Sequence, residues 1–160
     1  MLDEAAQPHE RYMVNKAIFL DRDGIINRKA PEGQYITRQE EFHFLPLVAE
    51  AIASLNQAGF KVIVVTNQRC LAKGLMTVHD LEGMHEWMCG VLATSGASVD
   101  DIYYCPHEEQ PPCDCRKPEP GMLLKGAREH DIDLSASWMI GDSDSDIEAG
   151  RRAGCRTAQV

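Results

Sequence analysis

The chain has 160 residues, a formal net charge of -9, an isoelectric point near 5.1 and 44% hydrophobic residues. This length suits one domain with its own hydrophobic core, and the acidic charge argues against a nucleic-acid-binding protein, which needs a basic face. No apolar stretch approaches the roughly 20 residues that span a bilayer, and the polar start is not that of a signal peptide. We therefore expect a cytoplasmic monomer without a membrane partner, whose residues 1–15 form a loose N-terminal arm.

A first strand is predicted from residue 16, in an apolar run that ends in the motif Asp21-Arg22-Asp23-Gly24. A short run of this kind, bounded by charge and Gly, is typical of a parallel strand buried on both faces. Residues 24–46 are interrupted by Gly and Pro and predict an irregular segment at the rim of a site.

The remaining chain alternates between helix and strand patterns. Apolar residues predict a helix from Leu47 that ends at Gly59. A second helix begins at a capping box formed by Thr77 and Asp80, and we expect its buried face to contain Val78, Leu81, Met84, Met88, Val91 and Leu92. Two further helices are predicted, one over residues 121–130 and one in the segment that carries Ile147, Ala149 and Ala153. The later strands are predicted over 61–66, 101–104, 138–140 and 156–160. This order predicts an α/β fold with a doubly wound parallel sheet.

The two carboxylates at the end of the first strand, Asp21 and Asp23, indicate an enzyme that acts on a phosphoryl group. Asp21 and Asp23 repel each other unless a cation lies near them, and Mg²⁺, which prefers oxygen ligands, suits that place. Asp21 can attack phosphorus to give an aspartyl-phosphate. Asp23 can protonate the leaving alcohol and later activate water.

The ends of the later strands supply groups that fit the same reaction. Thr66 offers a hydroxyl and a backbone amide to a phosphoryl oxygen, and Lys117 neutralises charge on the equatorial oxygens. Asp142 completes the shell of the cation, and Asp146 holds Lys117 in place. The spacing of Asp142, Asp144 and Asp146 does not match a calcium loop, because the Gly and the terminal Glu of that loop are missing.

These residues form four motifs, and through them the chain resembles the haloacid dehalogenase superfamily of phosphotransferases. The motifs stand in order as Asp21-Arg22-Asp23-Gly24, Val65-Thr66-Asn67-Gln68, Arg116-Lys117-Pro118 and Gly141-Asp142 to Asp146. Within the superfamily, the chain is similar to the D-glycero-D-manno-heptose 1,7-bisphosphate 7-phosphatases through three segments: Asp21-Arg22-Asp23-Gly24-Ile25-Ile26-Asn27, Tyr103-Tyr104-Cys105-Pro106-His107 and Cys113-Asp114-Cys115-Arg116-Lys117-Pro118. The histidinol-phosphate phosphatases share these features and remain an alternative.

The resemblance implies a Rossmann-type fold without a large cap domain. It also implies Mg²⁺-dependent hydrolysis of a phosphorylated sugar through an aspartyl-phosphate, in the pathway to lipopolysaccharide heptose. The magnesium ligands of the family fall on Asp21, Asp142 and the backbone carbonyl of Asp23. Its phosphate and substrate contacts fall on Thr66, Asn67, Arg116 and Lys117, and we extend them to the adjoining Gln68 and Arg69. The family usually continues with Ser-Gly after Gln68, whereas this chain has Arg69-Cys70.

Residues 105–115 contain a cluster of metal-ligand type. Cys105, His107, Cys113 and Cys115 offer three thiolates and one imidazole, which fits a closed, structural Zn²⁺ site better than free thiols. Such a site stabilises a loop with little core of its own and fixes the Arg116-Lys117 pair that follows.

Two other classes of function remain open from the sequence. The chain is either a phosphatase fold that binds a phosphorylated ligand without turnover, or a phosphotransferase with an acceptor other than water. The four histidines outside the cluster have no partners visible in the sequence: His43, His79, His85 and His130. The other cysteines, Cys70, Cys89 and Cys155, are expected to be small buried hydrophobic residues.

Overall fold

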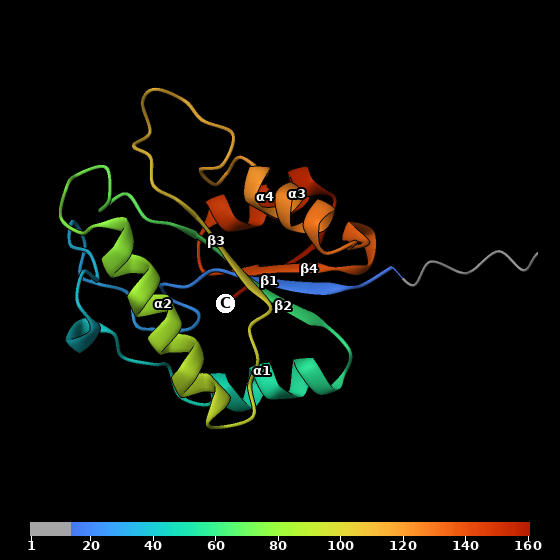
Figure 1. Cartoon of the computed structure of the whole chain (residues 1–160). Coiled ribbons are helices and arrows are strands. Elements are labelled where there is room, and N and C mark those ends of the chain that lie inside the picture. The colour runs from blue at the N-terminus through green and yellow to red at the C-terminus, as the bar shows by residue number, and fades with distance from the viewer. Residues whose placement is uncertain (1–13) are drawn as a thin grey trace, which may run out of the picture.

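The computed structural model describes residues 14–160, so the predicted N-terminal arm lies almost entirely outside the described residues. A five-stranded sheet forms the centre, with all neighbouring strands parallel and in the order β3-β2-β1-β4-β5 (Figure 1). The strands are β1 Ala17–Leu20, β2 Lys61–Asn67, β3 Asp101–Cys105, β4 Trp138–Gly141 and β5 Arg156–Gln159. The predicted doubly wound α/β sheet is therefore confirmed.

Helices cover both faces of the sheet, as Figure 1 shows. They are α1 Val48–Gln57, α2 Val78–Ala93, α3 Gly121–Glu129 and α4 Asp144–Ala153, and two 3-10 turns lie at Gln39–Glu41 and Leu134–Ala136. One core layer packs under α1 and α2 and contains Ile18 and Leu20, whereas the other packs under α3 and α4 and contains Phe19. Alternate residues of β1 thus point into opposite layers, which explains why the strand is apolar throughout.

The buried face of α2 differs from the predicted one. Its buried residues are Leu81, Met84, His85, Met88 and Leu92. The predicted core residues Val78 and Val91 are 48% and 37% exposed, so they lie off this face. The predicted capping box is present, because Thr77 Oγ1 accepts from the Asp80 backbone N–H and Asp80 accepts from the Thr77 N–H. The two short 3-10 turns were not predicted, since three residues show no periodicity.

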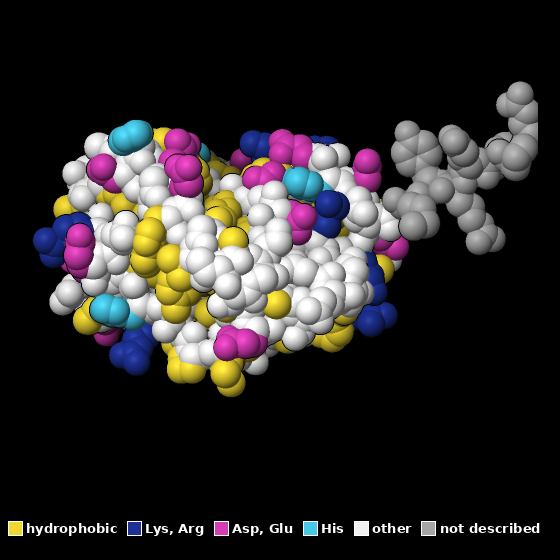
Figure 2. All heavy atoms as spheres, turned by 60° about the horizontal axis from the view of Figure 1, so that its bottom comes forward, with side chains coloured by type: hydrophobic (Ala, Val, Ile, Leu, Met, Phe, Trp, Pro, Cys, Tyr) yellow, Lys and Arg dark blue, Asp and Glu magenta, His cyan; other side chains and the backbone are white. Residues whose placement is uncertain are grey.

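Figure 2 shows the side of the molecule at the bottom of Figure 1, where α1 and α2 lie. Small apolar groups lie there among polar atoms, and Lys and Arg side chains stand apart from one another. Within residues 14–160, no helix combines the length and the apolar character needed to cross a membrane.

Candidate active site

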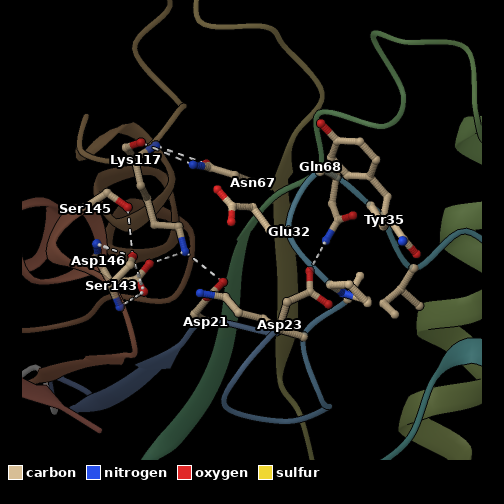
Figure 3. Close-up of a pocket in the computed structure, with 16 residues that line it drawn as sticks. Asp21, Asp23, Glu32, Tyr35, Asn67, Gln68, Lys117, Ser143, Ser145 and Asp146 are labelled. Carbon is tan, nitrogen blue, oxygen red and sulfur yellow. Dashed lines mark hydrogen bonds and ion pairs between the residues drawn. The ribbon is translucent and has the colours of Figure 1, made fainter.

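A cavity of about 570 Å³ lies where β1, β2 and β4 end, at the carboxyl edge expected for a ligand site in an open α/β sheet. Figure 3 shows acidic, basic and amide side chains converging on it. The residues that line it are Asp21, Asp23, Lys29, Ala30, Pro31, Glu32, Gly33, Gln34, Tyr35, Ile36, Asn67, Gln68, Lys117, Ser143, Ser145 and Asp146. Six predicted site residues, three of them acids, are therefore brought together.

Lys117 lies between two carboxylates at the floor of this cavity. Its Nζ is 2.9 Å from Asp21 Oδ1 and 2.6 Å from Asp146 Oδ1, and it also donates to the Val65 carbonyl at 2.8 Å. Asp146 is fixed in turn by the Ser143 hydroxyl and backbone N–H at the start of α4. The predicted pairing of Asp146 with Lys117 is thus present in the structure, and three hydrogen bonds fix the ammonium beside Asp21.

Burial and charge act in opposite directions on this group. Burial raises the pKa of Asp21 to about 6, against the lowering influence of Lys117. Burial alone would lower the pKa of Lys117, but Asp21 and Asp146 outweigh it and raise that pKa above its usual value. At neutral pH the lysine is charged and Asp21 is mainly an anion, which is the form a nucleophile needs.

Three side chains hold the Asp23 carboxylate. Arg22 Nη2 donates to Oδ1 at 2.9 Å and Asn27 Nδ2 donates to the same oxygen at 2.8 Å. Gln68 Nε2 donates to Oδ2 at 3.2 Å. The side chain of Asp23 is 26% exposed and borders the cavity, while these three hydrogen-bond donors fix its orientation.

Asp142 lies directly after β4 and is held close to the β1 loop. A Cβ on Gly24, which has a positive φ of 95°, would collide with the Asp142 carboxylate, so glycine is required there on both counts. Lys29 Nζ lies 2.6 Å from Asp142 Oδ2, while the buried Oδ1 has no hydrogen-bond partner among the described residues. Asp21, Asp142 and Asp146 each place an oxygen within 4.8 Å of the others, a set that could hold a metal ion.

The end of β2 supplies two residues with different surroundings. Thr66 is buried, and its hydroxyl oxygen accepts from Gln68 Nε2 at 2.9 Å, so the hydroxyl hydrogen remains available to donate. Asn67 pairs with the backbone of Lys117 in both directions: Oδ1 accepts its N–H at 3.0 Å and Nδ2 donates to its carbonyl at 3.2 Å. Asn67 therefore fixes the segment that carries the catalytic lysine candidate.

The two predicted arginines occupy different places. Arg116 lines a second cavity of about 500 Å³, which shares Asn67, Lys117 and Ser145 with the first. Arg69 lines neither cavity, because its guanidinium bonds to Glu108 of the 105–115 loop. The structure thus brings Arg116 beside the site and places Arg69 at the base of the loop.

The cysteine cluster has the dimensions of a tetrahedral metal site. Cys115 Sγ lies 3.0 Å from Cys105 Sγ and 3.7 Å from Cys113 Sγ, and Cys105 Sγ lies 3.7 Å from Cys113 Sγ. His107 Nδ1 lies 3.5 Å from Cys105 Sγ and 3.2 Å from Cys115 Sγ. Sulfur atoms around one zinc at bond lengths of about 2.3 Å stand about 3.8 Å apart, so slight expansion of this set accommodates the ion.

The electrostatics of Cys113 also favour metal binding. Burial acts to raise its pKa, but the Arg116 backbone N–H, which donates to the sulfur at 3.3 Å, and the neighbouring donors lower it to about 7. A thiol that ionises near neutral pH is a ready metal ligand.

Residues that the sequence did not indicate also shape this site. Arg22, Asn27 and His85 are buried and polar: Arg22 and Asn27 donate to the Asp23 carboxylate, and His85 contacts Arg22. A signal was available for His85, because it stands among Leu81, Met84 and Met88 on the buried face of α2, where a polar residue needs a partner.

Curated proteins from several bacteria match most of this chain. A D-glycero-beta-D-manno-heptose-1,7-bisphosphate 7-phosphatase of Rhodopseudomonas palustris is 41% identical over 145 residues, which cover 86% of this chain and 79% of that protein. The chain belongs to the heptose-1,7-bisphosphate 7-phosphatase family. Another family member, a D-glycero-alpha-D-manno-heptose-1,7-bisphosphate 7-phosphatase of Burkholderia mallei, is 41% identical over 152 residues and covers 91% of this chain and 79% of its own length.

Two further comparisons agree with membership of this heptose phosphatase family. A family model described as HAD-hydrolase-like matches residues 114–160. A solved D,D-heptose 1,7-bisphosphate phosphatase from B. bronchiseptica, complexed with magnesium and phosphate, superposes with a TM-score of 0.84 and 41% identity and covers 89% of this chain and 78% of its own. The predicted α/β fold and the predicted family are therefore confirmed.

Proposed function

We propose that this chain is a Mg²⁺-dependent phosphatase that removes the 7-phosphate of D-glycero-D-manno-heptose 1,7-bisphosphate through an aspartyl-phosphate on Asp21. The observation that carries the proposal is the arrangement of Asp21, Lys117 and Asp146 at the carboxyl edge of the sheet. Family membership adds support, because the relatives at about 40% identity bear that activity in their names.

The residues present fit a magnesium ion. Asp142 Oδ1 is buried and has no hydrogen-bond partner within residues 14–160, and a buried carboxylate oxygen of this kind requires a cation or a donor. Asp21 and Asp142, with the Asp23 backbone carbonyl, would supply hard oxygen ligands, and the open cavity leaves room for water and a phosphoryl oxygen. When bound, the ion supplies positive charge that lets an anionic phosphate approach anionic carboxylates.

Asp21 performs the first step of the reaction. Its carboxylate attacks phosphorus, and the bond from phosphorus to the sugar oxygen breaks as the new bond to Asp21 forms. Lys117, held by Asp146, balances charge on the transferring group, and the Thr66 hydroxyl donates to one of its oxygens. Asn67 contributes by keeping the Lys117 backbone in place.

Asp23 handles the protons of both steps. It donates a proton to the sugar oxygen as that oxygen leaves, and the resulting carboxylate then takes a proton from water as the water attacks the phosphorus on Asp21. Free phosphate forms and Asp21 is regenerated, so the catalytic groups end in their starting states.

The size and charge of the site support a phosphorylated sugar as substrate. The main cavity of about 570 Å³ lies in the range of small-ligand pockets. The adjoining cavity carries Arg116, whose planar guanidinium suits a second phosphate or sugar hydroxyls, and Gln68 borders the main cavity. We place the enzyme in the cytoplasm, as a monomer in the pathway to lipopolysaccharide heptose. Relatives named for the alpha and for the beta anomer are both 41% identical, so the assay uses both anomers of the bisphosphate.

We also propose that Cys105, His107, Cys113 and Cys115 hold a structural Zn²⁺. The four donors leave no open coordination position, which favours a role in folding over a role in chemistry. The bound ion would fix the 105–115 loop and, through the next residue, the direction of Arg116.

Phosphate release with Mg²⁺ tests the function, with the heptose 1,7-bisphosphate and histidinol phosphate assayed side by side and EDTA as the control. We expect a large preference for the bisphosphate and no release in EDTA. Preference for histidinol phosphate would contradict the substrate, and release from neither would contradict the phosphatase assignment in favour of a binding protein.

A further inference from the structure

Arg22 carries a charge in a place without solvent access. Its side chain is 0% exposed, although it lies between the two catalytic aspartates. A buried charge is costly unless it is paired and its hydrogen atoms are bonded. Asp23 satisfies one side of the guanidinium, with distances of 2.9 Å from Nη2 and 3.3 Å from Nε to Oδ1.

His85 of α2 satisfies the other side. Arg22 Nη1 lies 3.1 Å from His85 Nε2, with the Met84 sulfur at 3.8 Å. A guanidinium can only donate hydrogen bonds, so Nε2 must be the unprotonated acceptor and the ring proton lies on Nδ1. His85 is 5% exposed, and burial together with the Arg22 charge lowers its pKa to about 3, so the ring is neutral at physiological pH.

We propose that His85 is a positioning residue for the general acid and base of this enzyme, acting through Arg22 on the orientation of the Asp23 carboxylate. The inference rests on the proposed phosphatase function. It links α2, which covers one face of the sheet (Figure 1), to the proton-transfer step, because Arg22 contacts His85 on one side and Asp23 on the other.

His85 acts on Arg22 through its hydrogen-bond acceptor, the Nε2 atom. Without it, one guanidinium N–H is buried and unbonded, which is costly in a place that water does not reach. Arg22 then gains by turning toward another acceptor and weakens its hold on Asp23. Asn27 and Gln68 still donate to Asp23, so proton transfer is impaired and not abolished. General acid catalysis contributes about 10²–10⁴-fold, and we expect about a tenfold loss of rate.

The dependence on the leaving group separates positioning from a structural effect. An alkoxide of a sugar needs a proton as it leaves, whereas p-nitrophenolate does not, and kcat/KM reports the step that forms the aspartyl-phosphate. We expect His85→Leu to lower kcat/KM about tenfold for the heptose bisphosphate and less than about threefold for p-nitrophenyl phosphate. His85→Gln retains an acceptor and should restore both values to nearly those of wild type.

Met88→Ala provides the matched control, since Met88 lies one turn further along the buried face of α2 and is 0% exposed. Its loss of packing should lower thermal stability without changing the ratio of the two kcat/KM values. Zinc content and thermal stability are measured for every variant to identify misfolded protein.

Two results would overturn the inference alone: equal losses for both substrates in His85→Leu, or failure of His85→Gln to restore the sugar phosphate rate. If His85→Leu does not fold, His85→Phe, which keeps a ring but lacks the acceptor, decides by the same substrate ratio. A wild-type enzyme that releases no phosphate overturns the proposed function and this inference with it, so the two failures are distinguishable.

Discussion

At the scale of single residues, the site is arranged around the charge of Asp21. The fold raises the pKa of this carboxyl to about 6 from 3.8, chiefly by burial. Because the pKa of Asp21 is higher in the folded state than in the unfolded state, the fold favours the neutral carboxyl. Ionisation of Asp21 therefore lowers the stability of the fold as the pH rises above about 4, and the loss is complete above about pH 6. The proposed nucleophile is therefore held at a cost to stability, which Lys117 reduces.

Asp21→Asn should abolish turnover and leave the fold intact. The amide oxygen can still accept from Lys117, but it cannot form an aspartyl-phosphate, so we expect kcat to fall by at least about 10³-fold. Because the ionised carboxyl is absent, the melting temperature of the metal-free variant at pH 7 should not fall below that of wild type. Asp144→Asn, at an exposed position on the same rim, is the control. Near-normal phosphate release by Asp21→Asn would show that Asp21 is not the nucleophile.

Lys29 is expected to compete with magnesium for Asp142. Its ammonium lies 2.6 Å from Asp142 Oδ2, and this carboxylate is one of the proposed magnesium ligands. The lysine side chain is 53% exposed, so the pair contributes little, about 0.2–1 kcal/mol. Lys29→Met should therefore tighten apparent magnesium affinity by only about two- to fivefold. Magnesium-dependent thermal shifts measure it, with the neighbouring Arg28→Met as control, and weaker magnesium binding by Lys29→Met would contradict the competition.

At the scale of elements, the 105–115 loop and the motif that follows it are fixed by different contacts. Lys117 is held by Asn67, Asp21 and Asp146, none of which belongs to the loop. The Arg116 backbone instead donates to Cys113 Sγ and its side chain to the His107 carbonyl. Loss of the proposed zinc should thus affect Arg116 more than Lys117.

Cys113→Ser should lose stoichiometric zinc and raise KM for the bisphosphate about tenfold, with kcat changed by less than about threefold. The physical reason is that substrate contacts depend on Arg116, whereas charge balance at phosphorus depends on Lys117. Metal analysis and steady-state kinetics measure both effects, and Cys89→Ser, outside the cluster, serves as control. Retention of one zinc per chain by Cys113→Ser would refute the zinc site.

Elements that the sequence predicts well are those with strong periodicity. The strand before Asp21 and the helices around Ile52 and Leu123 follow from apolar spacing, and all four motifs stand at the expected edge of the sheet. The Arg22–His85 contact was not predictable in this way, because it joins residues 63 positions apart and depends on how α2 packs. The position of Arg69 likewise depends on Glu108, a partner 39 residues away.

At the scale of the whole molecule, stability should depend on pH through His85. The unfolded histidine has a pKa near 6.5 and the folded one about 3. The unfolded state thus gains a proton first, so the stabilisation is complete above pH 6.5 and is lost progressively as the pH falls toward 3.

Comparison of wild type with His85→Gln isolates this effect, since the carboxylates and thiols titrate in both. We expect the free energy of unfolding of wild type to fall by about 1 kcal/mol more than that of His85→Gln between pH 7.5 and 5.5. Denaturant unfolding at the two pH values measures the difference. If the free energy of unfolding depends on pH in the same way in both proteins, the pKa of His85 does not differ between the folded and the unfolded state, and the prediction is wrong.

The central position of β1 has a consequence for synthesis of the chain. β1 pairs with β2 from its own half of the sequence and with β4 from the other half, and Lys117 reaches Asp21 across 96 positions. Asp21, the proposed nucleophile, therefore leaves the ribosome long before Lys117, Asp142 and Asp146, which complete the site. A nascent chain that ends before residue 117 lacks Lys117. The exposed connection at residues 94–96, between α2 and β3, is a natural place to divide the protein into two complementing fragments. Recovery of activity on mixing such fragments would report their association directly.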